Sequence, residues 1–455
     1  MKLSKYNYYL ENKTEKDLMI YNTRTGAVIL IEDIDDKSRD MIKCNQIKTL
    51  DIDLKDFLME KEILVGDEVD ELADVKELYN LYVNDQNVLS LTILPTEGCN
   101  FACPYCFLYD KTNTTMRDED YDMLYDYISN FMSQRESERD RRLIINWFGG
   151  EPTLCAKKIT KFMNRIQTFV KEQKISLYST ITTNGYLMDG KMFQEFLESG
   201  ITDFQVTIDG EKENHDKTRY LRNGEGTYDT ILKNLVQIRS LNTEIDYQFK
   251  IRGNFTKNSI LHMYDFVRIY KEQIYDGKHF TLYFRPVYEY ETRKNEIEDI
   301  KQDIYSIGEG ILEQDKLMRY VAEQTGQIIE RRLVEKLPGP TFGWCNAEMK
   351  NHMIVGKGGK LYLCDTLVGY KSIGKLTKEE KIKLDDITTE YNIFEDERTA
   401  KCINCRNLPL CFGGCKRNRM EQEAQCFWNE KSIYELMKNN YYEKKGGKTY
   451  EVYCY

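Results

Sequence analysis

Residues 88–288 alternate short apolar segments, rich in β-branched and aromatic residues, with longer amphipathic segments. This alternation is typical of parallel βα units, because each parallel strand needs a crossover, usually a helix, to bring the chain back. The pattern predicts six such units, or three-quarters of a closed α/β barrel. The expected strands are 88–94, 143–147, 177–182, 203–208, 246–253 and 280–287, and the expected helices are 118–133, 156–172, 190–199, 228–241 and 260–275.

Conspicuous polar and cysteine-containing segments directly follow the first four predicted strands. The carboxyl ends of parallel strands meet at one rim of a sheet, and chemistry gathers there. We therefore expect these segments to lie close together. They are the triplet Cys99-x3-Cys103-x2-Cys106, then Gly149-Gly150-Glu151-Pro152, Thr183-Asn184-Gly185 and Asp209-Gly210.

Cysteines form a second group near the C-terminus, where seven lie between Cys345 and Cys426. The start of the chain has no signal-peptide core and no apolar run approaches the roughly 20 residues of a membrane span, so we expect a cytoplasmic protein. Thiols stay reduced there, and thirteen cysteines then favour metal over disulfides. The triplet supplies only three thiolates, and a four-iron cluster with three protein ligands has one iron that is open to a small molecule. Zinc fits this spacing poorly.

The charge of the chain disfavours a nucleic-acid partner. The net charge is −10 and the pI about 5.3, whereas phosphate binding requires a basic face. Residues 1–87 predict a small winged-helix-like module, with strands at 6–10, 18–21 and 27–31 and helices at 54–61 and 69–81. Its twelve basic and twenty acidic residues disfavour DNA binding. Two hypotheses remain for this module: a structural lid, or capture of a peptide on an exposed strand edge.

The triplet, followed by an aromatic residue, resembles the signature of the radical S-adenosylmethionine (SAM) superfamily. The resemblance implies a [4Fe–4S] cluster on Cys99, Cys103 and Cys106 whose open iron binds SAM, and reductive cleavage of SAM to a 5′-deoxyadenosyl radical. It covers residues 88–430, and residues 88–288 would form the partial barrel.

Other positions match SAM contacts of that superfamily. Gly149 and Gly150 would let the backbone approach the ligand, with Glu151 available for a cation. Arg219 would pair with the SAM carboxylate, although a surface salt bridge is the alternative. The remaining matches are Tyr105, as an adenine contact, Thr207, Arg252 and Asn254.

The C-terminal cysteines resemble the SPASM domain, which we place at residues 342–455 after a charged helical connector at 289–341. Gly356-Lys-Gly-Gly359 predicts a hairpin turn between strands 353–355 and 360–363. The resemblance implies two auxiliary [4Fe–4S] clusters, hence three clusters in total. It assigns Cys345, Cys364 and Cys415 to the first auxiliary cluster, and Cys402, Cys405, Cys411 and Cys426 to the second.

Two four-iron clusters have eight irons to ligate, and seven thiolates cannot fill all eight positions. Some relatives carry an eighth cysteine where this chain has Asn351. Either the first auxiliary cluster has an open iron, or Cys44, Cys155, Cys454 or a non-cysteine group completes it. Asp365 stands where sulfatase-maturing relatives have a general base, and burial beside a cluster would raise its pKa toward a useful range. The alternative role for Asp365 is to cap a turn.

The sequence therefore predicts a radical SAM/SPASM peptide maturase of the thioether-forming, ranthipeptide or sactipeptide type. Residues 1–87 would bind the leader of a ribosomally synthesised precursor peptide, and a flavodoxin or ferredoxin would supply electrons. A precursor cysteine bound at an open auxiliary iron would form a thioether with a carbon radical. The alternatives are an anaerobic sulfatase-maturing enzyme that makes formylglycine, a peptide C–C or C–O cross-linking enzyme, and an iron–sulfur electron carrier.

Overall fold

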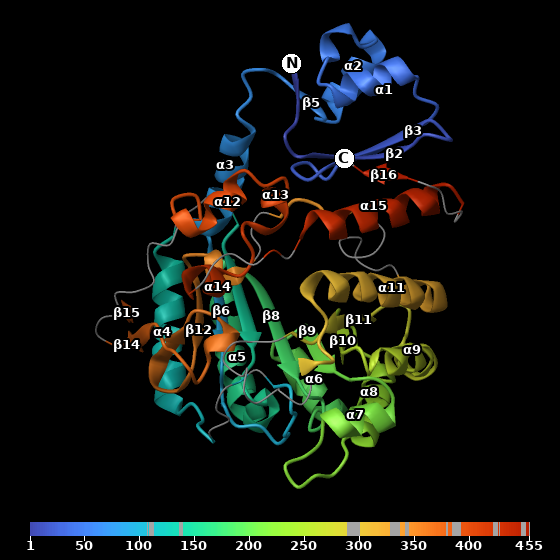
Figure 1. Ribbon diagram of the computed structural model, residues 1–455. Helices are drawn as coiled ribbons and strands as arrows, with labels where there is room; N and C mark the ends of the chain where they lie inside the picture. The colour runs from blue at the N-terminus through green and yellow to red at the C-terminus, as the bar shows by residue number, and fades with distance from the viewer. Residues whose placement is uncertain are drawn as a thin grey trace.

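The computed structural model describes residues 1–106, 108, 113–135, 140–288, 301–327, 337–341, 345–378, 381–384, 393–421, 426, 428–446 and 452–454. Figure 1 shows the N-terminal elements at one end, next to the C-terminal helix α15 (Glu430–Lys444), with the large sheet and its helices below them. No helix in this described part is long and apolar enough to cross a membrane.

Six parallel strands form most of a ten-stranded sheet. They are neighbours in chain order, so each crossover leads to the adjacent strand. This confirms the predicted α/β fold with six parallel strands and their crossover helices. The strands are β6 (Val88–Ile93), β7 (Arg142–Trp147), β8 (Ser176–Thr183), β9 (Asp203–Thr207), β10 (Gln248–Phe255) and β11 (Phe280–Pro286), and the helices are α4 (Asp118–Ser133), α5 (Ala156–Gln173), α6 (Gly190–Glu198), α7 (Lys212–Thr218), α8 (Tyr228–Arg239) and α9 (Ile260–Ile269).

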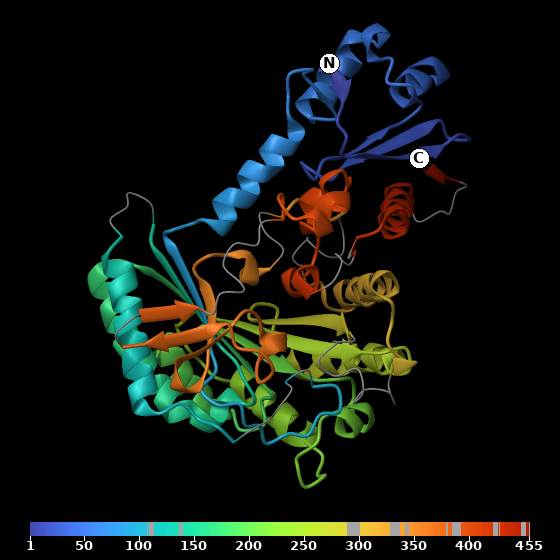
Figure 2. The same cartoon turned by 60° about the vertical axis from the view of Figure 1, so that its left-hand side comes forward.

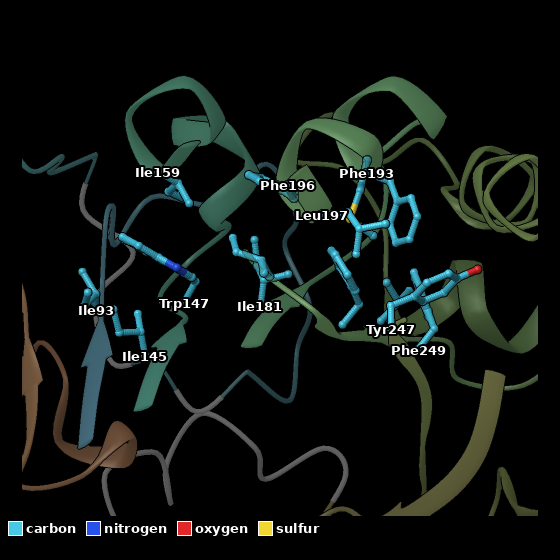
Figure 3. Close-up of a cluster of buried hydrophobic side chains, with 14 of the residues drawn as sticks. Ile93, Ile145, Trp147, Ile159, Ile181, Phe193, Phe196, Leu197, Tyr247 and Phe249 are labelled. Atoms are coloured by element: carbon cyan, nitrogen blue, oxygen red, sulfur yellow. The ribbon is translucent and has the colours of Figure 1, made fainter. Parts of the chain in front are cut away.

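The main apolar core lies between this sheet and its helices. Figure 3 shows Trp147 and Ile181 on the strands and Ile159, Phe193 and Phe196 on helices α5 and α6, and all five are buried in one cluster. Burial of such side chains stabilises the fold by roughly 1.5–3 kcal/mol each. The strands and helices are therefore held firmly together, so the loops at the strand ends are anchored on a rigid support.

Four more strands extend the sheet beyond β6. The predicted hairpin is present as β12 (His352–Val355) and β13 (Lys360–Tyr362), which pair antiparallel. The sequence did not reveal that β12 also pairs in parallel with β6, or that β14 (Gly374–Thr377) and β15 (Lys381–Leu384) follow. The hairpin therefore belongs to the same sheet as the barrel strands, and its turn at 356–359 lies next to the carboxyl end of β6.

The N-terminal elements form a small module. An antiparallel sheet of β2 (Asn7–Asn12), β3 (Asp17–Asn22) and β4 (Val28–Ile31) is followed by α1 (Asp36–Lys43), α2 (Ile52–Glu60) and α3 (Glu71–Val83), and β1 (Lys2–Leu3) pairs with β5 (Leu64–Val65). The three predicted strands and two predicted helices are present. Helix α1 was missed, because it is short and buries only Met41 and Ile42. Figure 2 shows α3 leading from the module toward the large sheet.

The end of the chain returns to this module. Strand β16 (Tyr453–Cys454) pairs antiparallel with β2, which gives the order β16-β2-β3-β4 (Figure 1). The predicted C-terminal domain, residues 342–455, does not include this pairing with the N-terminal sheet, because a two-residue strand has too few residues to show a pattern. Helix α11 (Ile307–Thr325) lies in the predicted connector, whose residues 289–300 and 328–336 are outside the described part.

Candidate functional site

A cleft opens at the carboxyl ends of β6 to β11. Its empty space, including the part open to solvent, is about 970 Å³. The structure brings together there all eight residues predicted to contact SAM and the three triplet cysteines. The lining includes Cys99, Cys103, Tyr105, Cys106, Gly149, Gly150, Glu151, Thr207, Arg219, Arg252 and Asn254, together with Gln205 and Tyr288, which the sequence did not indicate.

Gly149 and Gly150 lie against the backbone that leads into the triplet. A Cβ on Gly149 would lie 2.4 Å from the carbonyl oxygen of Thr96, and one on Gly150 would lie 2.1 Å from that of Gly98. The amide of Gly150 donates to the Thr96 carbonyl at 3.0 Å, and that of Glu151 donates to the Gly98 carbonyl at 2.9 Å. These glycines therefore admit the neighbouring chain, and they fix the triplet loop against the end of β7.

The Glu151 carboxylate is buried and committed to hydrogen bonds. Its Oε1 accepts from the amide and hydroxyl of Thr153 and from the hydroxyl of Thr183, and its Oε2 accepts from the amide of Asn184 at 2.7 Å. Burial raises the pKa of Glu151, and these donors act in the opposite direction. These hydrogen bonds join the ends of β7 and β8, and availability of the Glu151 carboxylate for a cation stays a prediction.

Tyr105, Asp209, Arg219 and Asn254 form one hydrogen-bonded group in the cleft. The Tyr105 hydroxyl donates to the Asp209 carboxylate, and it accepts from Arg219 Nη1 at 2.9 Å and from the Asn254 amide at 3.4 Å. Burial lowers the pKa of Arg219, but Tyr105, Cys103 and Asp209 outweigh it and leave the pKa raised. Arg219 is only 8% exposed, which rules out the surface salt bridge.

The Arg219 guanidinium keeps a donor available. Its Nε is buried and has no acceptor among the residues that the structure describes. An unsatisfied buried donor on a cation is costly. Because Arg219 also lines the cleft, its cation suits a ligand that carries a carboxylate.

A buried histidine supports this group from behind. His215 Nδ1 accepts from the amide of Asp209 at 3.2 Å, and its Nε2 lies 3.1 Å from the hydroxyl of Thr227, which donates to the carbonyl of Arg219 at 2.6 Å. Burial holds the pKa of His215 well below its usual value, so the ring is neutral, with its proton on Nε2. His215 lies four residues before Arg219 in the chain, and the sequence did not indicate this role.

Cys345 and Cys415, from the predicted first auxiliary set, are brought together by a buried ion pair. Glu348, three residues after Cys345, pairs with Arg419, four residues after Cys415. Both charged side chains are almost fully buried, with exposures of 3% and 0%. Each compensates the charge of the other, and removing one alone would leave an unpaired buried charge.

Cys364 joins these two cysteines through a second link. Its Sγ lies 3.0 Å from the hydroxyl of Thr366, which accepts from Arg417 Nη1 at 3.1 Å, on the helix that follows Cys415. Burial raises the pKa of Cys364 to about 12 and that of Cys345 to about 11, and Cys415 adds to both shifts. Thiolates this buried need a bound cation, which fits a metal-cluster site.

The predicted second auxiliary set lines one cavity. Cys402, Cys405, Cys411 and Cys426 surround an empty space of about 290 Å³. Burial raises the pKa of Cys402 and Cys405, and it raises that of Cys411 to about 12. The four thiols expected from the SPASM resemblance therefore converge.

The remaining cysteines lie elsewhere or are not described. Cys44 is exposed at the end of α1, and Cys155 is buried at the start of α5, in the barrel core. The Cys454 side chain lies outside the described part. Within the described ranges, no three Cys, His, Asp or Glu side chains are placed to share one metal ion. A four-iron cluster distributes its thiolates over separate irons, so it requires a wider spacing than zinc.

Asp365 lies between the two kinds of site. It follows Cys364, and its Oδ1 accepts from the amide of Thr366 at 3.0 Å. Burial raises the pKa of Asp365, and Arg252, which lines the cleft, acts in the opposite direction. Both the turn-capping contact and a basic carboxylate near the cleft are thus compatible with its position.

Residues 93–266 match the radical SAM superfamily. The chain is 25% identical over 354 residues to the cysteine-type anaerobic sulfatase-maturating enzyme of Clostridium novyi, which covers 73% of this chain and 88% of the relative. It is 22% identical to the serine-type enzyme of Bacteroides thetaiotaomicron, with 72% and 82% covered.

Solved structures share the fold. The structure of native anSMEcpe with bound AdoMet has a TM-score of 0.55 at 22% identity, covering 78% of this chain and 97% of that one. Streptococcus suis SuiB bound to its precursor peptide SuiA has a TM-score of 0.50 at 16% identity, covering 94% and 99%.

Residues 93–266 are therefore a radical SAM domain. The protein is a radical SAM enzyme related to the anaerobic sulfatase-maturating enzymes, and SAM and a [4Fe–4S] cluster are the cofactors of this family. The cleft residues fit SAM, because the triplet cysteines and Arg219 line the same space.

Proposed function

We propose that this enzyme acts on a ribosomally synthesised precursor peptide and forms a thioether from one of its cysteines. The observation that carries the proposal is the N-terminal sheet, whose β4 edge has no neighbouring strand among the described elements. An unpaired edge presents N–H and C=O groups to which a peptide strand can add. Residues 1–87 would hold the leader there, while the core of the peptide reaches the cleft.

The proposed cofactors are SAM and three [4Fe–4S] clusters, with cysteines as assigned from the sequence. When bound, they supply a 5′-deoxyadenosyl radical and an electron acceptor, and an external flavodoxin or ferredoxin would supply the electron that starts each turnover. Arg219 would hold the SAM carboxylate, and the loop containing Gly149 and Gly150 would keep the triplet in register. Asp365 would accept a proton near the cleft.

The proposed reaction breaks one C–H bond and one S–H bond of the peptide and forms one C–S bond. The hydrogen atom leaves in 5′-deoxyadenosine, the thiol proton goes to a base, and the remaining electron goes to the auxiliary acceptor. A first auxiliary cluster with an open iron would accommodate the substrate thiolate, in line with the three cysteines that converge there.

The second candidate is formylglycine formation on a sulfatase. It is favoured by the Clostridium novyi relative, which covers 73% of the chain at 25% identity, and by Asp365 beside Cys364. Both candidates use the same cleft, so the substrate decides between them.

The test uses anaerobically reconstituted enzyme, SAM, a reductant and the cysteine-containing peptide encoded beside its gene. We expect a product that is two hydrogens lighter and retains its sulfur, and much slower turnover of the same peptide without its leader. Loss of sulfur to formylglycine, with no dependence on the leader, would instead establish sulfatase maturation. The leaderless substrate is a cleaner probe than deletion of residues 1–87, because these residues pack against the second cysteine set.

A further inference from the structure

The N-terminal sheet packs directly on the loop that carries the second cysteine set. Tyr8 on β2 is fully buried, and its ring lies 5.3 Å from that of Tyr434 on α15, centroid to centroid. The guanidinium of Arg406, the residue after Cys405, lies 5.4 Å from the same ring. Tyr6, on the chain just before β2, packs in one apolar group with Cys402. The module is thus part of the wall around these thiols.

Asn407 contacts both the N-terminal module and the segments that carry the cysteines. It is 2% exposed and lies between Cys405 and Cys411 in the chain. Its backbone amide donates to Cys405 Sγ at 3.4 Å, and its carbonyl accepts from the Cys411 thiol at 3.5 Å. Its side-chain amide donates to the carbonyl of Trp428 at 2.9 Å, two residues beyond Cys426.

A further contact of Asn407 comes from the N-terminal module. The Tyr8 hydroxyl donates to Asn407 Oδ1 at 3.0 Å, across 399 residues of sequence. This bond fixes which way the amide points, and therefore directs its NH2 group toward Trp428. One hydrogen-bonded side chain thus links the N-terminal sheet to segments that carry three of the four cysteines.

We propose that Asn407, held by Tyr8, is a positioning residue for the second auxiliary cluster, and that the N-terminal module thereby tunes the reduction potential of that cluster. The inference rests on the proposed cysteine assignment. Hydrogen bonds to cluster sulfurs stabilise the more negative, reduced state and raise the potential. Loss of the Tyr8 hydroxyl leaves Asn407 Oδ1 unpaired and loosens the amide that donates to Cys405. The potential should then become more negative.

The test compares full-length, reconstituted wild type with Tyr8→Phe, which removes only the hydroxyl. Tyr9→Phe is the matched control, because Tyr9 is the next residue on β2 and packs on the other face of the sheet, against the cluster of Leu18 and Ile20. The second-cluster signal is identified in a redox titration followed by electron paramagnetic resonance, as the signal lost in Cys402→Ser. We expect Tyr8→Phe to keep the iron content and to shift this signal to more negative potential, with Tyr9→Phe unchanged.

The outcomes separate the inference from the assignment on which it rests. An unchanged potential in Tyr8→Phe, or an equal shift in Tyr9→Phe, overturns the inference while leaving the cluster in place. Wild-type protein without a signal that depends on Cys402 overturns the cluster assignment itself. Asn407→Asp is a second test variant, since it keeps an acceptor for Tyr8, removes the donor to Trp428 and adds negative charge. It should make the potential of the second cluster still more negative than Tyr8→Phe does, and a shift to more positive potential also overturns the inference.

Discussion

Replacing Gly150 with alanine should displace the triplet loop. The added Cβ would lie 2.1 Å from the carbonyl oxygen of Gly98 and 2.5 Å from that of Glu97, both backbone atoms that cannot rotate away. Ordinary contact begins near 3.4 Å, so the two segments must separate by about 1 Å. The hydrogen bonds from Gly150 to Thr96 and from Glu151 to Gly98 would weaken as a result.

The expected cost has two parts. Overpacking of this kind destabilises a fold by about 1–3 kcal/mol. A displacement of about 1 Å at a reacting centre can reduce the rate by about 100-fold. We therefore expect Gly150→Ala to lower the melting temperature of the apoprotein modestly and to reduce the release of 5′-deoxyadenosine from SAM by about 100-fold.

The assay measures 5′-deoxyadenosine by chromatography under anaerobic, reducing conditions, with iron content determined on the same samples. Gly339→Ala is the control, because a Cβ there meets nothing within 4 Å. Wild-type rates in Gly150→Ala would refute the reasoning, since they would show that the loop after β7 does not hold the triplet in register.

Three further predictions concern charged and titrating groups. Arg219→Lys loses the planar fork that reaches both Tyr105 and a ligand, so the SAM dissociation constant should rise at least about tenfold in equilibrium binding, and unchanged affinity would contradict the role. Asp365→Asn should abolish product while 5′-deoxyadenosine is still released, and a normal product yield in the variant would leave only the turn-capping role. In the wild type, the rate of product formation should fall with decreasing pH as Asp365 is protonated, with a pKa above the usual value of about 3.9. Burial lowers the pKa of His352 from 6.5 to about 4, so its contribution to stability is complete above pH 6.5 and is lost as the pH falls toward 4. His352→Gln should therefore show a shallower loss of melting temperature over this range, and an equal slope would argue against the assignment.

Much of the barrel could be predicted because its signals are local. Strand β9 was expected at 203–208 and lies at Asp203–Thr207, and helix α4 was expected at 118–133 and lies at those residues. Alternation of buried and exposed positions is a property of neighbouring residues, so the sequence carries it directly. Short elements such as α1 and β16 carry too few residues for such a pattern, and they were missed.

Within the site, the sequence predicted which residues gather, and the structure adds contacts that no local pattern indicates. Glu151 lines the cleft, and its carboxylate also joins two strand ends. The glycines before it line the cleft as well, and they also admit backbone of the same chain. The buried link that His215 makes between Asp209 and Arg219 depends on three-dimensional packing, so the sequence did not indicate it.

By itself, the amino-acid sequence determined the parallel strands, the order of the rim segments and the two groups of cysteines, because periodicity and spacing are written along the chain. Only the tertiary structure decided which distant residues meet. Examples are the Glu348–Arg419 pair, which joins the segments of Cys345 and Cys415, and the Tyr8–Asn407 bond, which joins the N-terminal sheet to the loop between Cys405 and Cys411. Each depends on segments that approach only when the whole core is formed, and no local pattern encodes that approach.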